Sequence, residues 1–317
     1  AAGIGSGNGS NGSTIINIEG GTITAEGGGK ENGSCQASGA GIGSGGNALN
    51  KTTINIKGGE ITATGGVSLD SRNHSDKWLS GAGIGSGSNV SGETEINISG
   101  DSTIKSASGG KYGGAGIGSG SYSGSTPDNK KGAVTINITD GTIEKATGGG
   151  EYVPSSKRWY SGAGIGAGLN AGTTTINIKD NAHIVSATGG KYGGAGIGSG
   201  SGDTKNDSKK GAVTINITDG TIEKAEGKDG GAGIGSGYYG RSSTVNISGN
   251  AELKDVKGGN LAAGIGSGYD SDKVDVVIDG GTIKATGGDS AAGIGSGHNS
   301  RSSVIIKSGT VNAAGNK

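Results

Sequence analysis

The sequence is most unusual in what it lacks. Its 317 residues include no Phe, no Met, two Pro and two Trp. A globular domain of this length needs bulky side chains to fill its core, so the composition argues against an ordinary globule. Basic and acidic residues balance at 27 each, and because no basic stripe stands out, we expect no nucleic-acid partner. The longest apolar runs are a few residues, too short to predict a membrane span.

Cysteine is nearly absent as well. Cys35 is the only one, which excludes an internal disulfide. A small loop residue and a reactive thiol both remain open for it, and one cysteine does not indicate a compartment. The chain begins with Ala inside a copy of a repeated motif and shows no signal peptide, so we interpret it as a segment of a longer protein.

Glycine, by contrast, is abundant, at 76 residues. It recurs in a tract that reads Gly-Ala-Gly-Ile-Gly-Ser-Gly or a close variant. The tract isoleucines are Ile4, Ile42, Ile84, Ile117, Ile165, Ile197, Ile234, Ile265 and Ile294. Their spacing varies from 29 to 48 residues. A fixed motif at variable spacing indicates stacked coils of constant frame joined by loops of free length.

Two further segments complete each repeat. One reads Thr-Ile-Asn-Ile, as at 53–56, and the other reads Gly-Thr-Ile-x-Ala-Thr-Gly-Gly, as at 281–288. Alternating β-branched residues between Gly and Asp turns are typical of strands, and no helical period appears. We therefore predict an all-β fold for residues 1–317, a single right-handed parallel β-helix (solenoid) domain. It has about nine coils, three short strands per coil and no helices. The tract isoleucines are expected to form one core column.

Alternation also places asparagines on the outer face of the second strand. They are Asn17, Asn55, Asn97, Asn137, Asn177, Asn216 and Asn246. Two interpretations remain open. Stacked amides would stabilise the rod by hydrogen bonds along its axis. Alternatively, together with threonines two residues earlier in the chain, they would form a flat ice-binding plane.

Aromatic residues gather just before the tract. Trp78 and Trp159 lie six residues before the tract isoleucine, and Tyr112, Tyr160 and Tyr192 lie five before it. They either close a corner of the coil or form a platform for glycans, since aromatic rings offer apolar faces with polar handles.

Two surfaces are candidates for self-association. Alternation predicts that the tract glycines form an outward face without side chains, which another rod could approach closely. The rod ends are expected to be unpaired sheet edges.

Catalytic and metal sites are not indicated. The arginines (Arg72, Arg158, Arg241 and Arg301) lie in or beside loops, and the histidines (His74, His183 and His298) lie in different coils without ligand spacing. The segment 203–207 resembles a calcium loop in composition only. We expect no cofactor, no metal and no enzymatic activity, with a polysaccharide-active β-helix enzyme as the competing hypothesis.

Together the tract, Ile-Asn-Ile and Gly-Thr-Ile-x-Ala-Thr-Gly-Gly segments resemble the glycine-rich parallel β-helix repeats of bacterial surface and secreted proteins. The resemblance covers almost the whole chain. It implies an adhesin-like, structural or carbohydrate-binding role outside the cell or at its surface, with a glycan or host-cell ligand as partner.

Overall fold

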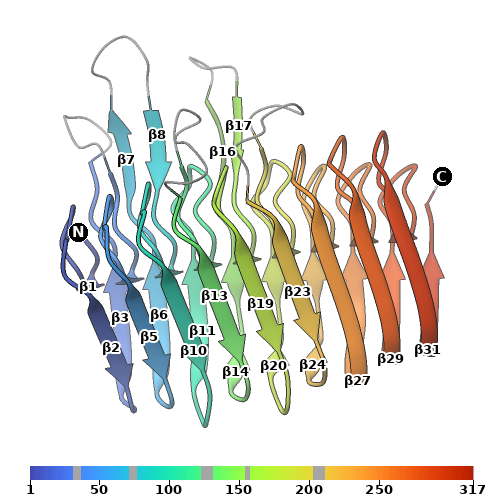
Figure 1. The fold of residues 1–317 in the computed structure, drawn as a ribbon, viewed down its shortest axis with the longest axis horizontal. Helices are drawn as coiled ribbons and strands as arrows, with labels where there is room; N and C mark the ends of the chain where they lie inside the picture. Colours follow the sequence, from blue (N-terminus) through green and yellow to red (C-terminus); the bar gives the residue numbers. More distant parts are fainter. Residues whose placement is uncertain (31–36, 71–76, 123–130, 154–157, 203–210, 317) are drawn as a thin grey trace.

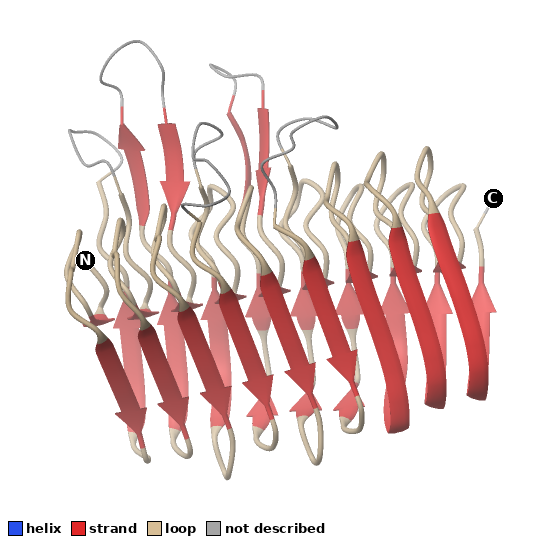
Figure 2. Ribbon diagram, viewed as in Figure 1, coloured by secondary structure: helices blue, strands red, loops and turns tan. Residues whose placement is uncertain are grey.

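The computed structural model describes residues 1–30, 37–70, 77–122, 131–153, 158–202 and 211–316. Strands and loops make up these residues, without a helix among them (Figure 2). The chain winds as a stack of nine coils, each numbered here by its tract isoleucine, from coil 1 with Ile4 to coil 9 with Ile294. In Figure 1 the near strands run downward, the far strands run upward and the chain advances from left to right, which is a right-handed path. The parallel β-helix is therefore confirmed.

The tracts form a nine-stranded parallel sheet in which every isoleucine pairs with the isoleucine of the next coil. Its strands are β1 (Ile4–Gly5), β4 (Ile42–Gly43), β9 (Ile84–Gly85), β12 (Ile117–Gly118), β18 (Ile165–Gly166), β22 (Ile197–Gly198), β26 (Ile234–Gly235), β28 (Ile265–Gly266) and β30 (Ile294–Gly295). The predicted isoleucine column is therefore present and in register.

The second strands form the near face of the rod in Figure 1. In coils 1 to 6 they are β2 (Thr14–Ile18), β5 (Thr52–Ile56), β10 (Thr94–Ile98), β13 (Val134–Ile138), β19 (Thr174–Ile178) and β23 (Val213–Ile217). Each points at least two aliphatic side chains inward and pairs residue for residue with its neighbours. In β13 and β23 a valine, Val134 or Val213, is a third. In coils 7 to 9 this strand continues around the corner into the third strand.

The third strands form the far face. They are β3 (Thr22–Glu26), β6 (Glu60–Thr64) and β11 (Thr103–Ser108), followed by the split pairs β14 and β15 (Thr142–Ile143, Ala146–Thr147), β20 and β21 (His183–Ile184, Ala187–Thr188), and β24 and β25 (Thr221–Ile222, Ala225–Glu226). The last three coils instead have single long strands, β27 (Ser243–Lys257), β29 (Val274–Thr286) and β31 (Ser302–Ala314). Three short strands per coil is thus correct only for the first part of the rod.

The split third strands have one more residue than the third strand of coil 1, and so does the continuous strand β11. Coil 1 has one residue between Ile23 and Ala25, whereas coil 4 has two between Ile143 and Ala146. All four of these side chains lie inside or pack against the core, so the additional residue must bulge outward. Where β11 meets β6, the register shifts just after Ile104. A bulge keeps both apolar side chains on the inner face at the cost of ladder bonds.

The core is a single cluster of aliphatic side chains along the rod axis. The tract isoleucines of coils 2 to 8 have no exposed surface, whereas Ile4 and Ile294 in the terminal coils are partly buried. Each buried isoleucine contributes about 1.5–3 kcal/mol. Because one coil supplies only a few such side chains, the stability of each coil depends on its stacked neighbours.

The glycine tract is not an outer face, so this prediction was wrong. In coils 2 to 8 the tract glycines are buried. A Cβ built on Gly118 would lie 1.8 Å from the carbonyl oxygen of Gly166, and one on Gly116 would lie 2.6 Å from both the Gly164 oxygen and the Thr147 nitrogen. The missing side chains thus make room for the backbone of the next coil and of the third strand. An interface between rods across these glycines is therefore excluded.

The tract serines form a second internal column. The Ser6 hydroxyl accepts a hydrogen bond from the Gly45 N–H of the next coil at 3.1 Å, and Ser119 accepts one from Gly168 at 2.8 Å. The same bond recurs from Ser44, Ser86, Ser199 and Ser236. Coil 5 has Ala167 at this position and lacks the hydroxyl. The serines thus satisfy buried backbone donors that a purely aliphatic column would leave unpaired.

The outward asparagines form the expected amide ladder. In each of six successive steps, from Asn55 onto Asn17 through to Asn246 onto Asn216, one amide nitrogen donates to the preceding amide oxygen at 2.8–2.9 Å. Val277 and Ile305 continue the column without amides. The axial hydrogen bonding that we expected is therefore present.

Candidate functional site

Loops and two hairpins project from the side of the rod that carries the glycine tracts (Figure 1). The hairpins are β7 (Val67–Asp70) with β8 (Lys77–Ser80), and β16 (Gly150–Val153) with β17 (Arg158–Ser161). They occur where the connection between the third strand and the next tract is longest. All five aromatic residues predicted to contact glycans lie on this loop side.

Three of those five residues form a small core rather than a surface. Tyr112 and Tyr160 are only 4% and 7% exposed, and they cluster with Val153 and Leu169. Trp78 packs against this cluster, with its ring centroid 4.5 Å from that of Tyr112. Tyr112 and Tyr160 therefore cannot form a glycan platform, and Trp78 contributes to closing the corner.

Trp159 and Tyr192 are arranged differently. Trp159 lies opposite Tyr152 in the β16–β17 hairpin, with ring centroids 4.2 Å apart and ring planes tilted by 37°. Its other ring neighbour is Tyr192, from the loop before the coil 6 tract, at 4.5 Å. Trp159 remains 44% exposed. Because Trp159 and Tyr160 are adjacent in a strand, they point to opposite faces, one outward and one into the small core.

Two tyrosines that the sequence reasoning missed complete the ring cluster. Tyr238 and Tyr269 each lie four residues after a tract isoleucine, in coils 7 and 8. Their rings stack almost parallel, with an interplanar angle of 3° and centroids 5.2 Å apart. His298 occupies the same position in coil 9 and stacks on Tyr269 at 5.5 Å. Because all three rings lie four residues after a tract isoleucine, the sequence could have predicted that they stack along the rod.

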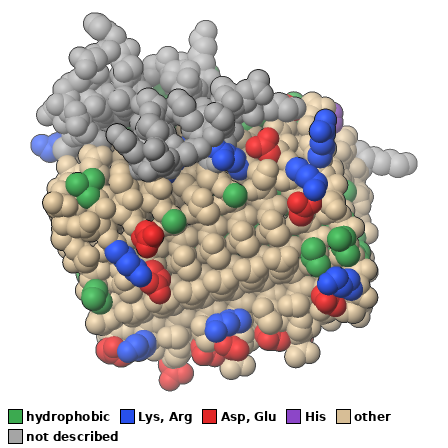
Figure 3. Space-filling model, viewed as in Figure 1, with side chains coloured by type: hydrophobic (Ala, Val, Ile, Leu, Met, Phe, Trp, Pro, Cys, Tyr) green, Lys and Arg blue, Asp and Glu red, His purple; other side chains and the backbone are tan. Residues whose placement is uncertain are grey.

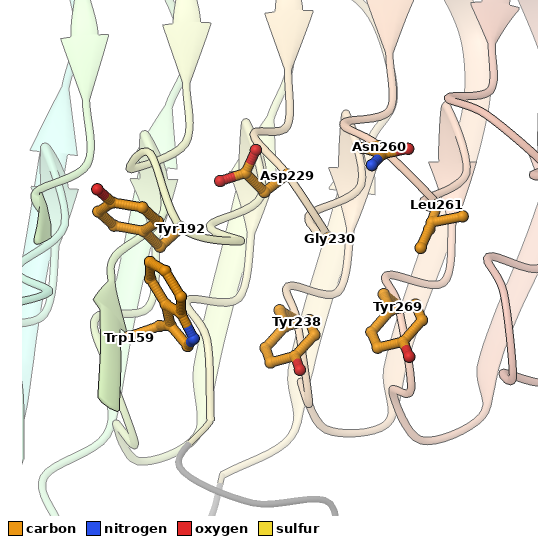
Figure 4. A pocket seen from close by; sticks show the side chains of 8 residues that line it. All are labelled: Trp159, Tyr192, Asp229, Gly230, Tyr238, Asn260, Leu261 and Tyr269. Atoms are coloured by element: carbon orange, nitrogen blue, oxygen red, sulfur yellow. The ribbon is translucent and has the colours of Figure 1, made fainter. Parts of the chain in front are cut away.

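These side chains line a groove that runs parallel to the rod axis, hereafter the aromatic groove. Its lining comprises Trp159, Tyr192, Asp229, Gly230, Tyr238, Asn260, Leu261 and Tyr269, around a volume of about 290 Å³. Figure 4 shows the Trp159 and Tyr192 rings on one side and the Tyr238 and Tyr269 rings side by side on the other, with Asp229 and Asn260 beyond them.

Glycine keeps the groove open. Gly230 lies beneath Tyr238, and a Cβ at this position would lie 2.6 Å from the Tyr238 ring and 2.9 Å from the Tyr269 Cβ. Gly193 is close to Tyr238 in the same way, with a φ of +95°. Side chains at either position would displace the rings. The loop glycines thus have a second role here, since they seat the tyrosines against the backbone.

The groove has a distinct polar character. Asp229 is the one charged side chain among its described lining residues. Burial raises the pKa of the Asp229 carboxyl, although nearby Lys191 and Lys228 oppose this shift. Burial and the neighbouring Tyr239 also raise the pKa of Tyr238 above its ordinary range, so its hydroxyl remains protonated. The site therefore combines ring faces, hydroxyl groups, one amide and one carboxylate.

The other polar residues considered from the sequence do not assemble into a site. His183 contacts Glu223 at 3.3 Å, and Glu223 also binds Lys254, which makes a surface ion cluster. Within the described ranges, no group of three or more His, Cys, Asp or Glu side chains is placed to hold a metal. In the same ranges no helix is long and apolar enough to cross a membrane. Cys35, Arg72, His74 and residues 203–207 lie outside the described residues.

The flat near face is the other surface with regular polar side chains. Figure 3 shows it as mostly uncharged, with charged groups scattered over it and along its edges. Outward threonines such as Thr135, Thr175 and Thr214 pair in register beside the asparagine ladder. Glu95 and Asp275 interrupt this threonine column.

A protein-family model described as a beta helix repeat matches six segments of the chain, residues 16–46, 54–88, 96–121, 136–169, 215–238 and 276–298. Together they cover more than half of the sequence. The search of curated proteins found no match, and neither did the search of solved structures.

Proposed function

Because the chain belongs to the β-helix repeat family, we propose that it is a non-enzymatic, adhesin-like rod that works outside the cell or at its surface and binds glycans through the aromatic groove. The rod is a rigid support, since every coil is held by its neighbours. Its loop side carries the variable segments, as expected for the binding side of a repeat protein.

One observation carries this proposal: exposed rings and polar groups converge in a preformed groove. Trp159 is held between Tyr152 and Tyr192 yet is 44% exposed. Aromatic rings bury the C–H faces of sugars, while the hydroxyl and amide groups nearby can bind sugar hydroxyls. A mostly apolar concave site with a few polar groups is the usual form of a ligand site, and about 290 Å³ suits one or two sugar units.

The polysaccharide-active enzyme is the less favoured alternative. Most glycoside hydrolases use a pair of carboxyl groups that flank the scissile bond. Among the described lining residues of the groove, Asp229 is the single carboxylate. Incubation with a panel of polysaccharides should therefore release no new reducing ends, and release that Asp229→Asn abolishes would establish an enzyme instead.

The binding proposal is tested by a glycan array followed by calorimetric titration with the tightest binder. Replacing Trp159 and Tyr238 with Ala should weaken binding at least about 30-fold, since each stacked ring contributes about 1 kcal/mol or more. The far-UV circular dichroism should not change, because neither ring belongs to the axial core.

Leu49→Ala is the control, since Leu49 is an exposed apolar residue, 54% accessible, that does not line the groove. It should bind as the unmodified chain does. Equal weakening by Leu49→Ala, or no glycan bound at any position of the array, would reject the proposal.

Ice binding is the second candidate function, favoured by one observation. The amide ladder fixes the asparagine side chains in register beside the threonine column. Against it, the asparagine amides already hydrogen-bond to those of neighbouring coils, so fewer of their donors and acceptors are free to bind ice. Thermal hysteresis at millimolar concentration decides this alternative, because a flat ice binder shows hysteresis and shapes ice crystals.

Self-association through the rod ends stays a prediction. Val304 and Ile306 of coil 9 are 37% and 53% exposed, whereas their equivalents in coil 8, Val276 and Ile278, are buried. Sedimentation velocity over a range of concentrations would detect end-to-end association of this chain.

A further inference from the structure

The aromatic groove contains one carboxylate, that of Asp229, beside its aromatic rings. In the part of the chain that the structure describes, Asp229 has no side-chain hydrogen bond or ion pair, and neither has Asn260. Carboxylates on the two sheet faces are commonly paired instead, as Glu95 is with Lys51 at 2.7 Å and Asp275 with Lys273 at 2.6 Å. Asp229 and Asn260 are both exposed at the edge of the groove, so a ligand that packs on the rings can also reach the carboxylate and the amide.

The electrostatics of the groove favour a cation. Aromatic rings present a negative face that attracts ammonium groups, and a neighbouring carboxylate adds to this attraction. Burial outweighs the attraction of Lys191 and Lys228, because the net effect on the Asp229 carboxyl is a raised pKa. Among the described residues, neither lysine forms an ion pair with the Asp229 carboxylate.

The two lysines are occupied elsewhere. Lys228 binds Glu226 at 2.5 Å, and Glu226 also binds Lys224 at 2.7 Å. Lys191 lies over the Tyr192 ring, 5.1 Å from its centroid, and does not line the groove. On the other side of the groove, Tyr238 and Tyr269 stack on each other. No Lys or Arg is among the described residues that line the groove.

We propose that the aromatic groove selects glycans that carry a free amino group, with the sugar ring against Trp159 or Tyr238 and the ammonium donating to Asp229. This inference rests on the proposed glycan-binding function and names the class of sugar. An N-acetylated sugar has no positive charge to offer, and an acidic sugar would be repelled by Asp229. Asn260 supplies a neutral donor and acceptor for neighbouring hydroxyls.

The test is calorimetric titration with three tetrasaccharides of equal length, at low salt and at a mildly acidic pH at which the amino groups of glucosamine oligomers are protonated. They are the β-1,4-linked tetramers of glucosamine, N-acetylglucosamine and glucose. The glucosamine tetramer should bind about tenfold more tightly than the other two, as expected for a hydrogen bond between charged groups. Equal binding of all three would overturn the inference and leave the glycan-binding function standing. Binding of none of them, together with an empty array, would reject both.

Two variants separate charge from shape. Asp229→Asn keeps the size of the side chain, and Asn tolerates the positive φ of 44° at this position. It should lose the tenfold preference while keeping its affinity for the N-acetylated tetramer. Lys191→Ala removes a competing cation near Asp229 and should tighten binding of the glucosamine tetramer only. Unchanged preference in both variants would contradict the role of Asp229.

Choline chloride distinguishes an ammonium on a sugar from an ammonium alone. If the sugar ring is recognised as we propose, choline should bind at least about tenfold more weakly than the glucosamine tetramer. Choline that binds as tightly as the tetramer would show that the groove is a cage for the ammonium group itself, which would overturn the assignment to amino sugars.

Discussion

Adjacent residues of this chain have opposite roles where its strands alternate. Tyr160 points into the small core below the hairpins, whereas Trp159 points outward and lines the groove. The same alternation separates buried Ile136 and Ile138 from Asn137 of the amide ladder. A single-residue shift in either strand would bury the polar side chain and expose the apolar one.

Ala167 offers a test at the residue scale. Of the seven steps between coils 1 and 8, six carry the serine hydrogen bond and only the step from Ala167 to Gly200 lacks it. A small cavity of about 10 Å³ borders both residues. Ala167→Ser should place a hydroxyl where the Gly200 N–H can donate to it. We expect the free energy of unfolding to rise by about 1 kcal/mol.

The matched change in the opposite direction is Ser119→Ala, which leaves the Gly168 N–H without its acceptor. It should lower the free energy of unfolding by about 1–3 kcal/mol. Urea denaturation followed by circular dichroism measures both. A destabilised Ala167→Ser variant would mean that coil 5 is packed too tightly for the hydroxyl.

At the scale of strands and turns, the tract shows why glycine dominates the composition. The glycine that directly follows each tract isoleucine has a φ near +135°, as at Gly118 and Gly166. Residues with side chains rarely adopt this conformation. The turn it permits directs the isoleucine into the core while the backbone of the next coil occupies the space of a Cβ.

Gly118→Ala should therefore destabilise the whole stack. Its Cβ would lie 1.8 Å from the Gly166 carbonyl oxygen in a conformation unfavourable for alanine. We expect a loss of at least about 3 kcal/mol in the free energy of unfolding, or failure to fold. Gly7→Ala is the control, since its Cβ would meet no atom within 4 Å, and it should change the stability by less than about 0.5 kcal/mol. Similar urea midpoints for the two variants would contradict the proposed reason for the glycines.

Much of the fold was predictable from the sequence, because strand alternation and the repeat interval determine which residues stack. The isoleucine column and the asparagine ladder follow from these two rules alone. Alternation failed in the tract, since it assumes a negative φ that Gly118 and its equivalents do not have. Alternation also did not predict that the second and third strands merge into the single strands β27, β29 and β31.

The candidate site was predictable only in part. Trp159 and Tyr192 lie in the groove as candidate contacts, but Tyr112 and Tyr160 are buried, since long loops fold back on themselves in a way that spacing does not reveal. Tyr238 and Tyr269 follow the tract instead of preceding it, and they meet the other rings only through the winding of the coils. Asp229 and Asn260 come from loops of different coils.

For the whole molecule, the stacked coils provide a rod of about 40 Å, with nine rungs about 4.8 Å apart. The two sheet faces are regular, and the aromatic groove lies where the loops of coils 5 to 8 converge. A glycan chain along the rod axis would therefore contact several coils at once, each through one loop. Binding would depend on the register between coils as much as on any single side chain.

The location of a bound glycan tests this account most directly. A crystal structure of the chain with the tightest-binding oligosaccharide should show a sugar ring between Trp159 and Tyr238, with Asp229 within hydrogen-bonding distance. A sugar bound instead on the flat asparagine face, or on the β7–β8 hairpin with the aromatic groove empty, would contradict the account.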